Sequence, residues 1–159
     1  MKVLVVYDSV YGNTEKIAVA VGGAFVQTDE VRVLRAAEVN IPDLESVDLL
    51  VVGSPTQAGR PVQAIKEFLS RIPANGLKNV GVTSFDTRFS KQDKGFWIRL
   101  VLNIFGYAAG RIASKLQSKG GNIVIAPEGF IVDDTEGPLK NGELERAPEW
   151  GKQIRESLK

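Results

Sequence analysis

The stretch Val3-Leu4-Val5-Val6-Tyr7-Asp8-Ser9-Val10-Tyr11-Gly12-Asn13-Thr14 decides the fold of this chain. Residues 3–7 are uninterruptedly apolar, which predicts a strand buried on both faces. Residues 8–13 are mostly polar and include a glycine, which predicts a loop. Over residues 14–26 the apolar side chains recur every four positions, as they do on one face of a helix, at Ile17, Val21 and Phe25.

Apolar strands and amphipathic helices alternate along the rest of the chain. Further strands are predicted at residues 30–35, 48–53, 79–84 and 122–125, and residues 130–132 either extend the last strand or start a hairpin. Between them, residues 85–95 are polar and read as irregular. Helices are predicted from Pro61 onward, over residues 96–119 with breaks near Gly106 and Gly110, and over residues 143–158.

This alternation predicts an α/β fold with a parallel sheet covered by helices on both faces. Right-handed crossovers leave few topologies, and the spacing suits a doubly wound, five-stranded sheet in the order 2-1-3-4-5. The length of 159 residues fits one domain over residues 1–159.

Composition excludes several classes of function. The chain has 20 basic and 19 acidic residues, so it lacks the large net positive charge that marks many nucleic-acid binders. It has neither Cys nor His, which removes thiol chemistry, Ser-His-Asp triads and metal sites built from these residues. Any chemistry would therefore come from carboxylates, Lys, hydroxyls, backbone groups or a borrowed cofactor. With no cysteine and no recognisable signal peptide at the start, the expected location is cytoplasmic.

Basic and apolar residues gather in one segment. Residues 86–120 carry seven basic and two acidic side chains, and residues 96–105, from Phe96 to Phe105, are strongly apolar. This segment is either core packing or a contact with a partner, a second copy or a membrane surface.

Ligands of open α/β sheets bind beyond the carboxyl ends of the strands, here residues 8–14, 54–60 and 84–89. The first of these loops offers hydroxyl, amide and backbone donors at the start of a helix, where a phosphate can bind without a cation. It contains no Lys, unlike a nucleoside-triphosphate loop, and no Gly-x-Gly-x-x-Gly pattern. The alternative interpretation is that Asn13 or Thr14 simply caps the helix.

Three motifs, in the right order, resemble the flavodoxin family over nearly the whole chain. Residues 9–14 (Ser-Val-Tyr-Gly-Asn-Thr) resemble its phosphate loop, and residues 53–61 (Gly-Ser-Pro-Thr-Gln-Ala-Gly-Arg-Pro) resemble its second flavin loop. Residues 137–150, from Gly137-Pro138 to Trp150, resemble a C-terminal pattern of the same group.

The resemblance implies a flavodoxin-like fold that binds flavin mononucleotide (FMN). Carried over by position, the phosphate loop would comprise Ser9, Val10, Tyr11, Gly12, Asn13 and Thr14. One face of the flavin ring would meet Pro55, Thr56, Gln57, Ala58 and Gly59. Its other side would meet Ser84, Phe85, Asp86, Thr87 and Arg88. Gln57 stands where flavodoxins often have an aromatic residue, so Phe85 or Phe89 would stack on the ring instead.

The implied function is electron transfer between redox partner proteins. A flavin-dependent quinone or protoporphyrinogen-type oxidoreductase near a membrane surface is the alternative, favoured by the basic and apolar segment. A phospho-receiver domain shares the strand order but needs paired acids after the first strand. Arg60 and Arg88, if close to the ring, would stabilise the reduced flavin anion, unless they are ordinary solvated charges.

Overall fold

The computed structural model describes residues 1–90, 95–96 and 106–159. The strands of this part are β1 (Lys2–Tyr7), β2 (Glu30–Arg35), β3 (Leu49–Pro55), β4 (Gly81–Phe89), β5 (Asn122–Ile123) and β6 (Glu128–Val132). Its α-helices are α1 (Asn13–Gly23), α2 (Gln63–Arg71), α4 (Ala108–Ser118) and α5 (Glu143–Ser157), with short 3-10 helices at Ala36–Glu38 and Ile41–Ser46.

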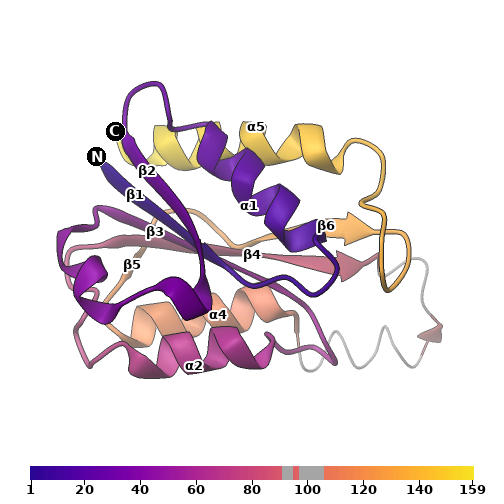
Figure 1. Cartoon of the computed structure of the whole chain (residues 1–159), viewed down its shortest axis with the longest axis horizontal. Helices are drawn as coiled ribbons and strands as arrows, with labels where there is room; N and C mark the ends of the chain where they lie inside the picture. Colours follow the sequence, from indigo (N-terminus) through magenta and orange to yellow (C-terminus); the bar gives the residue numbers. More distant parts are fainter. Residues whose placement is uncertain (91–94, 97–105) are drawn as a thin grey trace.

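The strands form a parallel sheet in the order β2-β1-β3-β4-β5, and β6 also pairs with β4. Helices α1 and α5 cover one face of the sheet, while α2 and α4 cover the other (Figure 1). Because β1 and β3 are buried on both faces, their valines and leucines feed two cores. The predicted doubly wound order, 2-1-3-4-5, is confirmed.

The carboxyl half of β4 differs from the prediction. Residues 85–89 are not irregular, because they pair with β3 on one side and with β6 on the other. Phe85 points into the core on the α1 side, and the neighbouring residue Asp86 is buried too. The strand tolerates this charge because Arg88 pairs with it. The alternating positions of Phe85, Thr87 and Phe89 are a sequence signal that could have indicated a longer strand.

Three other element boundaries also differ from the prediction. The final strand is split into β5 and β6, both parallel to β4, so residues 130–132 extend the sheet and do not start a hairpin. Helix α2 begins at Gln63, two residues after Pro61. Gly110 lies inside α4 and does not break it, whereas Gly106 precedes that helix with a φ of 71°.

The apolar segment from Phe96 to Phe105 lies outside the described residues, apart from exposed Phe96. Within the described ranges, we find no helix that combines the length and hydropathy required to cross a bilayer.

Candidate functional site

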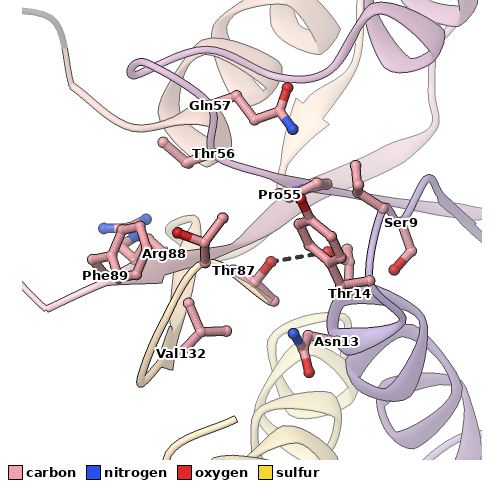
Figure 2. Close-up of a pocket in the computed structure, with 13 residues that line it drawn as sticks. Ser9, Asn13, Thr14, Pro55, Thr56, Gln57, Thr87, Arg88, Phe89 and Val132 are labelled. Atoms are coloured by element: carbon pink, nitrogen blue, oxygen red, sulfur yellow. Dashed lines mark hydrogen bonds between the residues drawn. The ribbon is translucent and has the colours of Figure 1, made fainter. Parts of the chain in front are cut away.

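A pocket opens where β1, β3, β4 and β6 end, and it encloses about 490 Å³, including the part open to solvent (Figure 2). The pocket is lined by Ser9, Val10, Tyr11, Asn13, Thr14, Pro55, Thr56, Gln57, Thr87, Arg88, Phe89, Val132 and Thr135. Of these described residues, Arg88 alone carries a charge.

The first loop leaves the start of α1 open to a ligand. Gly12 occupies the N-cap position in the left-handed region, with a φ of 91°, and α1 starts at Asn13. A glycine offers no capping side chain, so the first-turn N–H groups of α1 are not capped in this way. The Gly12 N–H itself is held by the Ser9 hydroxyl at 2.9 Å. The interpretation of Asn13 or Thr14 as an N-cap is therefore wrong.

The Thr14 side chain faces across the pocket instead of back onto its own helix. Its Oγ1 lies 2.9 Å from Oγ1 of Thr87, and both residues are buried (Figure 2). Each hydroxyl has a second hydrogen-bonding capacity beyond this contact. The pair therefore joins α1 to β4 at the pocket wall while keeping one hydroxyl hydrogen to donate to a ligand.

The loop after β6 closes the site beside Asn13. The Asn13 side-chain amide donates to the carbonyl oxygen of Glu136 at 3.1 Å. Gly137 packs so closely here that a Cβ on it would lie 2.7 Å from that amide nitrogen. The Asn13 side chain is thus fixed by the C-terminal loop that carries the third sequence motif.

A charged cluster around Arg35 holds the first loop in place. Arg35, at the end of β2, donates to Asp8 at 3.0 Å, to the carbonyl oxygen of Ser9 at 3.3 Å and to Glu15 at 3.0 Å. Through these bonds the end of β2 restrains both sides of the loop. Sequence reasoning missed this residue because its partners are remote in the chain.

The second loop turns sharply at residues 57–60. Gln57 and Arg60 exchange backbone hydrogen bonds of 2.9 Å, and both Ala58 and Gly59 have positive φ, at 49° and 74°. This is the geometry of a tight hairpin turn, whose second central position favours glycine. The Gly59 carbonyl oxygen accepts a 2.8 Å hydrogen bond from Arg111 of α4. The turn is thereby anchored to the helix beside it.

Asp86 and Arg88 form an ion pair in the wall formed by β4. The Arg88 guanidinium donates to both carboxylate oxygens of Asp86, which is fully buried. The backbone N–H of Ala109 donates to the same carboxylate at 2.8 Å. Burial raises the pKa of the Asp86 carboxyl group, and Arg88 and the Ala109 N–H oppose that rise. Arg88 is therefore neither a solvated charge nor an unpaired one.

The pocket brings together most residues of the first two predicted loops, together with Thr87 and Arg88. Gly12 shapes the first loop and Ala58 and Gly59 form the turn, without being among the lining residues. Ser84 and Phe85 lie in the interior: the Ser84 hydroxyl donates to the carbonyl oxygen of Ala109, and the Phe85 ring packs on Phe130 and Trp150. Asp86 is buried, pairs with Arg88 and is not among the lining residues. Of the two candidate stacking residues, Phe89 lines the pocket.

Phe89 was predicted only as one of two candidates for stacking, and two further lining residues were not predicted: Val132 and Thr135. The rule that ligands meet the carboxyl ends of strands would have identified the last two, had residues 130–132 been read firmly as a strand.

Comparison with known proteins gives one consistent result. The family model described as flavodoxin matches residues 5–151. A flavodoxin of Aquifex aeolicus (strain VF5) is 40% identical over 73 residues, which cover 45% of this chain and 40% of the length of that curated relative.

Two solved structures share the fold over their whole length. Oxidised Flavodoxin 1 from Bacillus cereus superposes with a TM-score of 0.76 at 19% identity, covering 98% of both chains. A flavodoxin from the domain Archaea gives a TM-score of 0.73 at 21% identity, covering 99% of both chains.

Proposed function

This chain belongs to the flavodoxin family, and from that premise we propose that it holds FMN in the pocket at the carboxyl ends of β1, β3, β4 and β6 and carries one or two electrons between redox partners. The flavodoxin family binds FMN, and flavodoxins transfer electrons to redox partner proteins. The family match weighs against a phospho-receiver domain. We also propose, from the sequence, that residues 1–159 form one domain and that the protein is cytoplasmic.

The residues present fit this cofactor. A phosphate monoester needs several donors at one end of the site, and the uncapped start of α1 and the buried Thr14–Thr87 hydroxyl pair supply them. A flat aromatic ring needs apolar walls, and Pro55, Phe89 and Val132 offer them on different sides of the pocket.

For the phosphate end, we assign the N–H groups of residues 13–15 and the hydroxyl of Thr14. The first backbone hydrogen bond of α1 runs from the Lys16 N–H to the Gly12 carbonyl, so the N–H groups before Lys16 have no helical acceptor. The dipole of α1 adds a partial positive charge at this point. The single observation that carries the proposal is this pocket, which joins an uncapped helix start to a buried hydroxyl pair.

For the ring, Pro55, Thr56 and Gln57 line one side and Phe89 is the aromatic candidate for stacking. Bound FMN supplies the redox chemistry, because its ring accepts and returns electrons. The protein positions the ring and excludes water from its buried parts. The oxidoreductase alternative was favoured by the basic and apolar segment of residues 86–120. The apolar part of that segment, residues 96–105, is outside the described part of the chain apart from Phe96.

The test is a fluorescence titration of the apoprotein with FMN, followed by anaerobic reduction with dithionite and mixing with cytochrome c as an electron acceptor. We expect stoichiometric binding at micromolar concentrations and stoichiometric delivery of electrons, without catalytic consumption of NAD(P)H in the presence of a quinone. No uptake of FMN would refute the cofactor assignment. Sustained NAD(P)H turnover would establish the enzyme alternative.

A further inference from the structure

The Arg88 side chain is held rigidly in the pocket wall. Asp86 binds two of its nitrogens, and the Tyr107 ring centroid lies 3.6 Å from its Cζ. On β6, Gly129 leaves the space that the guanidinium fills, since a Cβ there would lie 2.4 Å from Cζ and Nε. The side chain of Arg88 is 20% exposed. A fixed guanidinium presents its charge to a ligand from one position.

The position of the Asp86 carboxylate is also fixed by hydrogen bonds. It accepts hydrogen bonds from Nε and Nη2 of Arg88 and from the Ala109 N–H in the first turn of α4. The Thr56 side chain is also hydrogen-bonded to it. Donors that converge on the two oxygens, including one at the positive end of a helix, fit the ionised carboxylate. The side chain has no exposure to solvent. An arginine and a buried carboxylate in this contact form a pair with no net charge.

We propose that Asp86 is a positioning residue that neutralises Arg88, so that the pocket does not favour the reduced cofactor as a bare arginine would. This inference rests on the proposed FMN site. Reduction adds two electrons, supplied by dithionite, and one proton from water to the neutral ring, and yields a ring monoanion. A net positive charge in the wall would bind that anion more tightly than the oxidised ring, whereas a neutral pair binds both more evenly.

Asp86→Asn tests the inference because it leaves the Arg88 charge without its partner. The measured quantity is the ratio of the Kd for oxidised FMN to the Kd for reduced FMN. It is obtained from the difference between the anaerobic reduction potentials of bound and free FMN, and fluorescence gives the Kd for oxidised FMN separately. We expect this ratio to rise about tenfold in Asp86→Asn, the effect of one unit charge partly screened at the pocket wall. No rise in a folded variant would overturn the inference.

The double variant Asp86→Asn/Arg88→Gln decides the matter if the single variant does not fold. It replaces the ion pair by two neutral side chains of similar size, an exchange that buried pairs often tolerate. Because the pair and its replacement both carry no net charge, the ratio should stay within threefold of the wild-type value. A larger fall would mean that the pair acts as a net cation, and a larger rise would mean that it acts as a net anion. Either result refutes the neutralising role of Asp86.

Two controls separate this inference from other causes. Glu67→Gln changes the net charge by the same amount on the exposed surface of α2 and should leave the ratio unchanged. An equal rise in Glu67→Gln would show a general charge effect and overturn the role of Asp86. If the wild-type apoprotein binds no FMN, the proposed function itself fails. If it binds FMN and the Asp86 variants do not behave as stated, only the present inference fails.

Discussion

Thr14→Val should weaken FMN binding while sparing riboflavin, which lacks the phosphate. Valine keeps the shape of threonine and removes the hydroxyl that lies 2.9 Å from Thr87 at the pocket wall. A hydrogen bond to a charged group contributes about 1.5–3 kcal/mol, which corresponds to a roughly 10- to 150-fold rise in Kd. The rise should appear for FMN and not for riboflavin, because the hydroxyl is assigned to the phosphate.

The assay is quenching of flavin fluorescence, with each variant titrated with FMN and with riboflavin. Thr14→Val also removes the hydrogen bond to Thr87, so the free energy of unfolding should fall by about 1 kcal/mol. Thr83→Val is the matched control, since the Thr83 hydroxyl is buried in β4 and donates to the Ile125 carbonyl, away from the pocket lining. It should lower stability to a similar extent and leave both affinities unchanged.

An equal loss for FMN and riboflavin in Thr14→Val would refute the assignment of this hydroxyl to the phosphate. So would an unchanged FMN affinity, because the buried hydroxyl pair would then serve only to join α1 to β4.

Three further variants test the scaffold of the site. Gly53→Ala should lower the free energy of unfolding, measured in urea, by about 1–3 kcal/mol, because the added Cβ would lie 2.1 Å from the Phe85 ring. Gly110→Ala on α4 is the control and should not destabilise the protein, because its Cβ would meet nothing within 4 Å. Equal stability of the two variants would contradict the packing of Phe85 on Gly53. Arg35→Gln should weaken FMN binding less than about tenfold, since its ion pairs are partly exposed and act by holding the loop; a larger loss would indicate direct contact with the phosphate. Burial would raise the pKa of Glu143, but the hydrogen bonds from Arg146 and the Ile131 N–H outweigh this and lower it from 4.5. The folded state therefore takes up a proton at lower pH than the unfolded state, and stability present above pH 4.5 is lost as the pH falls through the folded pKa. Glu143→Gln should flatten this acid loss in thermal melts, and an unaltered slope would exclude Glu143 as its source.

The fold could be predicted because its signals are local. Residues 3–7 are apolar throughout, and so short a run with β-branched residues indicates a strand covered on both faces. The regular spacing of apolar residues after the first strand and after residues 48–53 then indicated helices, and right-handed crossovers limited the possible topologies. Local patterns are weaker where two distant segments stabilise each other. The strand β4 continues to Phe89 because β6 pairs with it there, and no pattern near residue 85 reveals that partner.

The site was predictable as far as topology dictates it. The loops after β1 and β3 meet because parallel strands end at one edge, and both line the pocket. The orientation of individual side chains depended on tertiary contacts. Phe85 faces the core because Gly53 leaves room for its ring, and Asp86 faces Ala109 because adjacent residues of a strand point to opposite faces. The pairing of Asp86 with Arg88 follows from that geometry.

The most direct measurement is an amide ¹H–¹⁵N NMR titration of the apoprotein with FMN. If FMN binds with its phosphate at the start of α1, the largest shifts will be those of the amides of residues 12–15, with Thr87 also affected. Riboflavin should perturb residues 55–57 and Phe89 while leaving residues 12–15 nearly unchanged. Shifts concentrated elsewhere, such as the groove between α1 and α5 near Gly23 and Lys152, would contradict the phosphate site.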